Sequence, residues 1–311
     1  MTQVAVGLPV YNAERYLEQA LESLVNQTHR DLEIVISDNG STDRTSEICE
    51  RYAAQDPRIT YYRHDSNRGA GWNFNFVLDH ANAPYFRWYA YDDCLDARCI
   101  ELCADALDAD ASLILVWPRT IVIDENGTVS EENSNTLWWD AGTPSSRVNS
   151  LLGRPLVESL LRLCHPIYGL MRREVLMRAR RHGSYPSADC ALLVELAVLG
   201  PWARVPEAVF YSRRHLESST VNKTPEQIAA WFDPRRSAAK AVMPITKLFC
   251  GYVLAVLTRG VPLRERMRCM REVLVWVSKE RQWRVIYSEY KLRAKQILGQ
   301  VVVHRLGIRR S

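Results

Sequence analysis

Two adjacent carboxylates, Asp92 and Asp93, stand directly after Tyr85–Tyr91, an aromatic run typical of a buried strand. In an open α/β sheet, ligands bind beyond the carboxyl ends of the strands. Two acids at such an edge repel each other unless a cation lies beside them, and oxygen ligands suit Mg²⁺ or Mn²⁺. Acids also occur in the first turn of a helix, where they offset its dipole. The pair therefore predicts a divalent-metal site or a helix start.

Polar residues follow three earlier apolar runs in the same way. The runs are Val4–Val10, Leu32–Ser37 and Ile59–Tyr62, and they read as strands because each is short, apolar and bounded by turn residues. They are followed by Asn12, by the turn 38–43 and by the loop 67–71. Asn12 could cap the next helix, and the residue types of the turn 38–43 also suit a tight turn that binds nothing.

The segments between these runs have the apolar period of helices, and Leu113–Trp117 reads as a further strand. Strands that alternate with helices at this spacing predict an α/β fold with a parallel sheet and helices on both faces. The loops after the strands then crowd at one edge of the sheet. The sequence contains no GxGxxG fingerprint and no P-loop, so neither a dinucleotide-dependent oxidoreductase nor a P-loop phosphotransferase is supported.

The pattern changes after Trp117. Ile121–Ile123 reads as a strand that runs into a turn, and residues 128–150 show no clear period, which predicts an irregular loop. Further predicted elements are helices at Leu151–Leu163 and Cys190–Leu199, a strand at Val205–Tyr211, and helices with basic faces from residue 224 onward.

Composition is that of a folded globular protein, with 47% hydrophobic and 24% charged residues in 311. The eight cysteines form no CxxC pair, so buried thiols in a reducing compartment are expected rather than a zinc or disulfide framework. No secretory signal and no apolar run long enough to span a bilayer is visible. These features predict a cytoplasmic protein. A second expectation is peripheral contact of this protein with the inner face of the membrane.

The charge is unevenly distributed. Residues 240–311 hold 16 Lys and Arg against 4 Asp and Glu, so they carry +12, whereas the whole chain carries +4. Basic amphipathic helices with interspersed Trp276 and Trp283 suit an anionic membrane surface. A helical bundle or a subunit contact explains the same pattern. Nucleic-acid binding is not favoured, because no recognised binding motif accompanies the charge.

The chain resembles the family 2 glycosyltransferases, which have the GT-A fold, over about residues 3–215. The resemblance rests on five segments in the family's order: Gly7-Leu8-Pro9-Val10-Tyr11-Asn12, Ser23-Leu24-Val25-Asn26-Gln27-Thr28, Ser37-Asp38-Asn39-Gly40-Ser41-Thr42-Asp43, Asn67-Arg68-Gly69 and Asp92-Asp93. It implies a nucleotide-sugar-binding half at residues 1–117, an acceptor-binding half at 118–223 and, beyond the resemblance, a basic helical extension at 224–311.

The resemblance also implies roles for individual residues. The nucleotide-sugar site would comprise Pro9, Tyr11, Asn12, Asp38, Asp43, Asn67, Arg68 and Asp92. Asp38 would accept a hydrogen bond from the imide N–H of uracil or thymine, which favours a UDP- or dTDP-sugar. Where the family often has a second acid, this chain has Asn39. The metal, Mn²⁺ or Mg²⁺, would be bound by Asp93, with Asp92 close by.

Two later residues complete the implied site. Asp189 stands before the apolar run of a helix, where the family places its general base, although an acid there also caps a helix. His215 follows a strand, where the family often has a metal ligand, although a lone histidine can be structural. The implied reaction is a single displacement with inversion, in which Asp189 deprotonates a hydroxyl of a glycan or lipid-linked acceptor.

Two other classes stay open at this point. A non-catalytic module that binds sugar nucleotides or glycans would keep the fold without a working base. A nucleotidyltransferase would need a Gly-rich, Arg-containing loop after the first strand, but Leu8-Pro9-Val10-Tyr11-Asn12 occupies that position.

Overall fold

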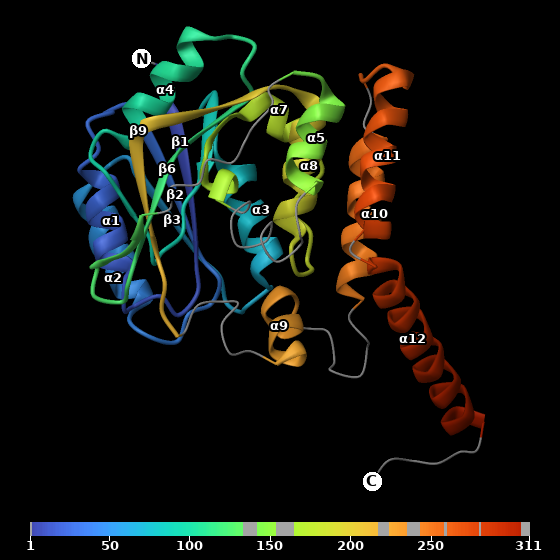
Figure 1. Cartoon of the computed structure of the whole chain (residues 1–311). Coiled ribbons are helices and arrows are strands. Elements are labelled where there is room, and N and C mark those ends of the chain that lie inside the picture. Colours follow the sequence, from blue (N-terminus) through green and yellow to red (C-terminus); the bar gives the residue numbers. More distant parts are fainter. Residues whose placement is uncertain are drawn as a thin grey trace.

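Figure 1 shows the computed structural model, which describes residues 2–132, 142–153, 165–216, 224–234, 243–257, 260–279 and 281–305. A nine-stranded sheet lies between two layers of helices, with strand order β3-β2-β1-β4-β8-β6-β9-β5 and β7 paired with β6. The strands are β1 (Val4–Val10), β2 (Leu32–Asp38), β3 (Ile59–Arg63), β4 (Tyr85–Trp88), β5 (Cys94–Leu95), β6 (Leu115–Ile123), β7 (Val129–Glu132), β8 (Leu170–Arg172) and β9 (Trp202–Arg213).

The first four strands are parallel, as the sequence predicts. β1 pairs with β2 and with β4, and β2 pairs with β3. All seven residues of β1 are buried, which suits a strand covered by helices on both faces. The register pairs Val10 with Asp38 at the last position of each strand. The carboxyl ends of β1 and β2 are therefore level, and the loops that follow them start side by side.

The sheet as a whole is mixed, so the expectation of a parallel sheet is wrong for its second half. β8 is antiparallel to both β4 and β6, and β5 is antiparallel to β9. The three-residue β8 fills the position between β4 and β6, while β6 and β9 are parallel to each other. The predicted runs Leu113–Trp117 and Ile121–Ile123 belong to the single strand β6, whose register shifts at Pro118, a residue with no N–H to donate.

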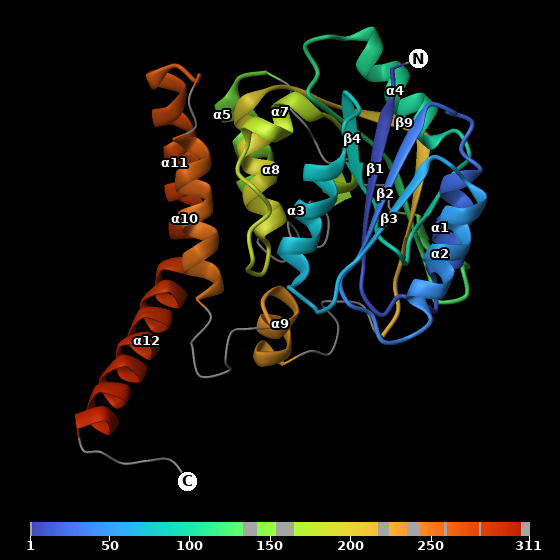
Figure 2. The same cartoon turned by 180° about the vertical axis from the view of Figure 1, so that it is seen from behind.

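The helices divide into two layers around this sheet (Figures 1 and 2). One face carries α1 (Leu17–Val25), α2 (Thr45–Gln55) and α4 (Cys99–Ala109). The other carries α3 (Ala70–His80), α5 (Pro144–Leu152), α7 (Arg173–Arg178) and α8 (Ala188–Leu199), together with the 3-10 turn His165–Tyr168. Each layer has its own apolar core, the first around Leu21 and Ile34 and the second around Trp88 and Leu193.

The basic C-terminal part packs on the second layer. It forms α9 (Pro225–Phe232), α10 (Pro244–Val256), α11 (Leu263–Lys279) and α12 (Gln282–Arg305). In Figure 2, α10 and α11 lie on the far side of α8 from the sheet. α8 is apolar on nearly all sides because other elements cover both of its faces. Leu248 and Tyr252 of α10 are buried against that layer. Among the described residues, no helix is long and apolar enough to cross a membrane.

Several predicted boundaries differ from the structure. Residues 128–150 contain β7 and α5 at their two ends, while 133–141 lie outside the described residues. α5 starts where it does because Thr143 accepts a hydrogen bond from the Ser146 N–H and Pro144 suits the first turn. Most of the predicted helix 151–163 also lies outside the described residues. β6 runs across the boundary proposed at 117/118, and the three-part division of the chain stays a prediction.

The partly buried His165 makes stability depend on pH. Burial lowers the pKa of His165 to about 4, and the charge of Arg214 acts in the same direction. Below about pH 6.5 the unfolded chain binds a proton at this residue that the folded chain does not bind. We expect the free energy of unfolding to fall as the pH drops from 7 toward 4, by at most about 1.4 kcal/mol per pH unit for one such histidine.

Denaturant titrations at a series of pH values measure this dependence. His165→Gln should give a shallower slope than the wild type, whereas His80→Gln, at an exposed position, should keep the wild-type slope. A wild-type slope in His165→Gln would rule out this histidine as the cause.

Candidate functional site

Asn39 ties together the loops that follow β1, β2 and β3. Its backbone N–H donates to the carbonyl of Val10 at 3.0 Å. Its side-chain amide donates to Asn67 Oδ1 at 3.0 Å and to the Gly69 carbonyl at 3.3 Å, and its Oδ1 accepts from the Arg68 N–H at 2.9 Å. The residue is 2% exposed. A carboxylate only accepts hydrogen bonds, so an acid at position 39 could not make the two donated side-chain bonds.

Asp38 lies beneath these loops, fully buried. Its Oδ1 accepts from the Ser41 N–H at 2.9 Å, and its Oδ2 accepts from the Tyr61 hydroxyl at 3.0 Å. Burial and the charge of Asp38 raise the pKa of Tyr61, so the phenol keeps its proton and donates. Each carboxylate oxygen retains a second acceptor position. The contact of Asp38 with a base stays a prediction.

The segment after β1 packs against the turn after β2. Asn12 adopts φ of 48°, a left-handed conformation that Asn tolerates better than most residues. Its N–H donates to Ser41 Oγ at 2.9 Å, and its Oδ1 accepts from the Thr42 N–H at 2.9 Å. Asn12 therefore binds the neighbouring turn and does not cap α1, which corrects that expectation. Pro9 is buried within β1, whereas Tyr11 is 38% exposed and could stack against a planar ligand.

Asp43 joins the same network from the other end of the turn. Its Oδ2 accepts from the Glu14 N–H at 3.1 Å, and its Oδ1 accepts from the Thr45 N–H at 3.0 Å, at the start of α2. The carboxylate thus fixes the turn 38–43 against the segment after β1. The place of Asp43 in the nucleotide-sugar site stays a prediction.

The loop 67–69 presents a cation at this edge of the sheet. Arg68 is exposed, and its guanidinium lies over the ring of Trp72, 4.6 Å from the centroid. Asn67 Oδ1 accepts from the Gly69 N–H at 2.8 Å and holds the turn. Gly69 has φ of 91°, and a Cβ there would collide with the carbonyl of Phe232 at the end of α9. α9 therefore contacts the site, although it lies outside the predicted family region.

The two adjacent acids have different surroundings. Asp93 is 5% exposed, and its Oδ1 accepts from the backbone N–H of Arg213 at 2.8 Å. Burial, and next the charge of Asp92, raise the pKa of Asp93 well above its usual range, while Arg213 and Arg87 oppose that rise. The side chain of Asp92 is more open, at 19% exposure, and its Oδ2 lies 2.9 Å from His215 Nε2. The structure thus brings Asp92 and His215 together across 123 residues of chain.

Arg213 is the residue of this site to which the sequence assigns no role. Its Nε donates to the Asp92 carbonyl at 2.9 Å, and its Nη2 donates to Gln19 Oε1 at 2.8 Å. Its Nη1 reaches the carbonyls of Asp124 and Glu125, both at 3.2 Å. The pairing of Cys94 with Tyr211 in antiparallel strands places Arg213 opposite Asp92. Its place two residues before His215, at the end of a strand, is the sequence signal that could have identified it.

The Asp92–His215 pair is the part of the site that suits a metal. No cluster of three or more His, Cys, Asp or Glu side chains arranged for a metal occurs among the described residues. The hydrogen bond between Asp92 Oδ2 and His215 Nε2 does, however, join an oxygen donor and a nitrogen donor at 2.9 Å. A divalent ion bound with a diphosphate takes only one or two ligands from carboxylates, and the phosphates and water supply the rest. The donor set fits Mn²⁺, which accepts imidazole as well as oxygen ligands, and also Mg²⁺.

Asp189 lies in the first turn of α8, partly exposed, after Ser187 in a left-handed conformation. Burial lowers the pKa of His182, and the nearby charge of Asp189 acts against this. The loop before α8 is held to α3, because the N–H and carbonyl of His182 bond to the amide of Asn75, both at 2.9 Å. A Cβ at Gly71, at the start of α3, would lie 2.8 Å from Ser184 Oγ. Asp189 therefore follows a loop that contacts the N-terminal end of α3, which is the end next to Arg68.

Comparison with known proteins gives this site its context. The model of the glycosyl transferase family 2 matches residues 5–179, more than half of the chain. The chain belongs to the family 2 glycosyltransferases. The chondroitin synthase of Escherichia coli is 26% identical over 221 residues, which cover 71% of this chain and 30% of that relative. The chain thus spans less than a third of the relative's length.

Solved structures of glycosyltransferases share the fold. TarS 1–349 from S. aureus, solved with UDP-GlcNAc, matches with a TM-score of 0.62 at 16% identity, over 88% of this chain and 72% of that one. The mannosyltransferase PcManGT of Pyrobaculum calidifontis, solved with GDP-Man and Mn²⁺, matches with a TM-score of 0.52 at 17% identity, over 96% and 87%. The predicted family and GT-A fold are confirmed, and these low identities show the fold alone.

The bonds of Asn39 generate a prediction about stability. Asn39→Asp should lower the free energy of unfolding by about 1–3 kcal/mol, because the carbonyls of Asn67 and Gly69 lose a donor in a buried place. Urea titration measures the change. Asn126→Asp, the same replacement in an exposed turn after β6, is the matched control and should stay within about 0.5 kcal/mol of the wild type. Equal stability of the two variants would show that the amide donor at position 39 is dispensable.

Proposed function

We propose that this chain transfers a sugar from a nucleoside-diphosphate sugar to a hydroxyl group of a glycan or lipid-linked acceptor, with inversion at the anomeric carbon. The observation that carries the proposal is the pairing of Asp92 with His215 at 2.9 Å, on the sheet edge where the loops joined by Asn39 begin. Family membership supports it, as do the relatives solved with UDP-GlcNAc and with GDP-Man. Such an enzyme would serve polysaccharide biosynthesis.

The loops after β1, β2 and β3 would bind the nucleotide. Tyr11 would stack on the base, and Asp38 would accept from its imide N–H through the acceptor positions that Ser41 and Tyr61 leave open. This contact favours a UDP- or dTDP-sugar. Arg68, held over Trp72, would face the negative charge of the diphosphate. The remaining residues of the predicted site, namely Pro9, Asn12, Asp43 and Asn67, would shape the loops around the nucleotide.

Asp92 and His215 would hold the divalent cation. Asp93, the metal ligand that the family resemblance implies, would instead fix the turn that carries Asp92. This assignment follows from the pairing of the side chains, because Asp92 Oδ2 lies 2.9 Å from His215 Nε2, whereas Asp93 Oδ1 accepts from the Arg213 N–H. When bound, Mn²⁺ or Mg²⁺ would neutralise the charge that develops on the leaving diphosphate. Arg213 would keep the Asp92 carbonyl, and with it the turn, in place.

Asp189 would act as the general base. It would accept the proton of the acceptor hydroxyl as that oxygen attacks the anomeric carbon from the side opposite the diphosphate. His182, whose ring is stacked 5.0 Å from Phe74, lies in the loop that precedes Asp189. Attack from the opposite side makes an α-linked donor yield a β-linked product.

Replacing the base tests this assignment. Asp189→Asn should lower the transfer rate at least about a hundredfold, because the amide cannot take the proton, while the affinity for the donor nucleotide changes less than twofold. Transfer is followed by chromatography of products, and nucleotide affinity by calorimetry. Asp105→Asn, at an exposed acid on α4, is the control. A rate close to the wild-type value in Asp189→Asn would remove it as the base.

The metal assignment has its own test. Calorimetry should show that Mn²⁺ tightens the binding of UDP or dTDP to the wild type. In Asp92→Asn and in His215→Gln, this increase in affinity should be at least about tenfold smaller, because removing a group that supports a metal weakens metal binding by that much. Affinity measured in EDTA should be the same in all three proteins. An undiminished gain from Mn²⁺ in both variants would refute the proposed ligands.

The surface of α11 and α12 supports a second proposal, contact with an anionic membrane. Exposed apolar side chains stand among basic ones there: Leu263, Met267, Leu274, Trp283, Tyr287 and Leu292. Trp276, predicted to contribute, is instead buried and packs on Tyr252 at 5.0 Å. The +12 charge of residues 240–311 complements anionic lipid headgroups. An enzyme held in this way could reach a lipid-linked acceptor.

Flotation with lipid vesicles measures this contact. The chain should float with phosphatidylglycerol vesicles and not with phosphatidylcholine vesicles, and Trp283→Ser combined with Tyr287→Ser should reduce flotation several-fold. Met177→Ser, on α7, should leave it unchanged. Loss of self-association in the double variant without any flotation of the wild type would identify the surface as a subunit contact instead.

A further inference from the structure

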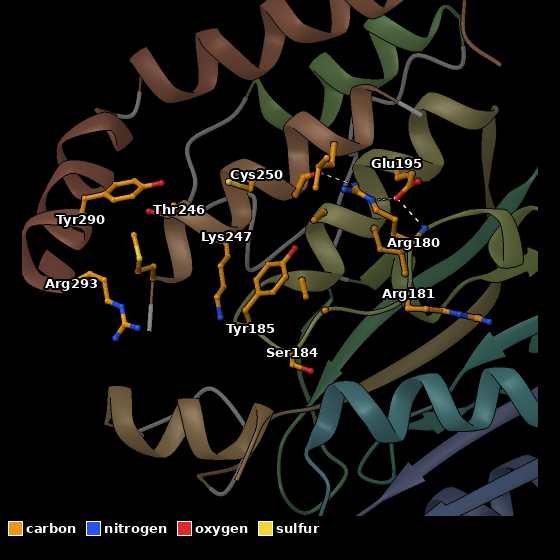
Figure 3. A pocket seen from close by; sticks show the side chains of 17 residues that line it. Arg180, Arg181, Ser184, Tyr185, Glu195, Thr246, Lys247, Cys250, Tyr290 and Arg293 are labelled. Carbon is orange, nitrogen blue, oxygen red and sulfur yellow. Dashed lines mark hydrogen bonds and ion pairs between the residues drawn. The ribbon is translucent and has the colours of Figure 1, made fainter. Parts of the chain in front are cut away.

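Within the described part of the C-terminal extension, α9 is the helix that reaches the proposed donor site. α10 and α11 pack on the outer side of α8. Figure 3 shows a space of about 760 Å³ between α8, α10 and α12, and its described lining includes no residue of the predicted nucleotide or metal site. α9, in contrast, contacts α3 and lies beside the end of α3 that follows the loop 66–69 (Figure 2). This loop, which carries Arg68, is called the Arg68 loop below.

Gly69 allows the end of α9 to lie directly against the Arg68 loop. Gly69 is buried and has φ of 91°, a conformation that favours glycine. A Cβ at this position would overlap the carbonyl oxygen of Phe232 and lie 2.8 Å from its carbonyl carbon. The same Cβ would be 3.2 Å from Cα of Asp233. The backbone at the end of α9 is therefore in contact with the residue that follows Arg68.

A second glycine brings the turn after β2 equally close to this loop. Gly40 has φ of 77°, and a Cβ there would lie 2.8 Å from the carbonyl carbon of Ser66. The side-chain amide of Asn39 adds a hydrogen bond to the Gly69 carbonyl, at 3.3 Å. The backbone of the loop thus has two neighbours, the turn after β2 and α9. Arg68 stands between the residues that they contact.

α9 has a defined start and a buried end. At its start, the backbone N–H of Thr224 donates to Gln227 Oε1 at 2.8 Å, and the N–H of Gln227 donates to Thr224 Oγ1 at 3.3 Å. This reciprocal arrangement is a capping box. At its end, Phe232 is 9% exposed, and its ring lies 4.6 Å from that of Trp231. A helix of 8 residues is too short to be stable alone in water, so its packing helps to hold it in place.

The contact restricts the backbone at a position where freedom would weaken binding. Glycine has more conformational freedom than other residues, and Gly69 directly follows the cation proposed for the diphosphate. The guanidinium of Arg68 is exposed and lies over Trp72, so its direction depends on the backbone that carries it. A loop that is ordered before its ligand arrives binds more tightly, because less conformational entropy is lost on binding.

We propose that α9 is part of the donor site, and that its packing on Gly69 positions Arg68 for the diphosphate of the nucleotide sugar. The inference rests on the proposed function for the identity of the ligand, whereas the contact between α9 and the loop can be tested without a ligand. A helix outside the matched family region would then contribute to donor affinity. By linkage, a nucleotide that fixes Arg68 also stabilises the position of α9.

Alanine replacements of two glycines test the contact from the side of the loop. Gly69→Ala should weaken the binding of UDP with Mn²⁺ at least about tenfold in calorimetry, because the added Cβ displaces α9 and loosens Arg68. Gly260→Ala is the matched control, since Gly260 has φ of 93° and no described atom lies within 4 Å of the added Cβ. Its UDP affinity should stay within about twofold of the wild type. Uridine, which lacks the diphosphate, should bind both variants like the wild type.

Replacing Phe232 tests the contact from the side of α9 and leaves the sequence of the loop unchanged. Phe232→Ala should weaken UDP binding several-fold, and it should have no further effect in a chain that also carries Arg68→Gln. Phe249→Ala, the same replacement on α10, should bind UDP within about twofold of the wild type. The thermal unfolding midpoint of each variant confirms folding. Additive effects of Phe232→Ala and Arg68→Gln would show that α9 does not act through Arg68, and would overturn the proposal.

Hydrogen exchange without nucleotide separates this inference from the proposed function. The N–H groups of Arg68 and Gly69 donate to Asn39 Oδ1 and Asn67 Oδ1, at 2.9 and 2.8 Å. They should exchange at least about threefold faster in Phe232→Ala than in the wild type, and Phe249→Ala should match the wild type.

Two results would overturn the inference and leave the proposed function standing. One is unchanged exchange of these N–H groups in Phe232→Ala, and the other is equal affinity for UDP in Gly69→Ala and Gly260→Ala. A chain in which α9 protects these groups but which binds no UDP would refute the proposed function, and with it the donor role of α9. The positioning of Arg68 by α9 would then still stand.

Discussion

The bonds that Arg213 makes to the Asp92–Asp93 turn are the interaction on which the proposed site depends. The N–H of Arg213 binds one acid and its guanidinium binds the carbonyl of the other, at 2.8 and 2.9 Å. This tie joins the turn after β4 to the end of β9, and it brings His215 to Asp92. The guanidinium also lies over Tyr16, 4.8 Å from the ring centroid, which is in turn 4.7 Å from the ring of His215. One buried cation thus supports both proposed metal ligands.

A second set of polar ties does the same for the nucleotide side. Parallel strands end level with one another but supply no bonds between the loops that follow, so those loops need side-chain partners. Asn39 provides them because an amide both donates and accepts. The two sets differ in reach: Asn39 joins loops that lie close in sequence, whereas Arg213 joins segments 120 and 121 residues apart. Disturbing either tie should loosen one side of the site and leave the other formed.

The sequence predicts the local elements well because their cause is local. The bounds of β1, β2 and β3 agree with those of their apolar runs to within one residue. The bounds of α8 agree with those of the predicted helix to within two residues. The mixed order of the second half was not predictable, since the position of β8 between β4 and β6 depends on pairing across the whole chain. The joining of two predicted strands into β6 was hidden by Pro118, which usually marks a break.

The residues of the site divide in the same way. Motif order points to the acids and His215 as candidates, because their types carry chemistry and they follow strands. The position of Arg213 two residues before His215 was a signal, but the partners of Arg213 and Asn39 are set by the fold and could not be predicted. The contact of α9 with Gly69 shows the same limit, since a glycine does not indicate which carbonyl lies against it.

In the proposed enzyme, one sheet edge binds a nucleotide sugar through Asp92 and His215, with Asp189 on the acceptor side. A crystal structure of the chain with a UDP-sugar and Mn²⁺, with anomalous data collected at the manganese edge, tests it most directly. We expect a manganese peak at Asp92 and His215, the base against Tyr11 and Asp38, and the Asp189 carboxylate on the side of the sugar opposite the diphosphate. A manganese peak on other residues, or a nucleotide bound away from this edge, would contradict it.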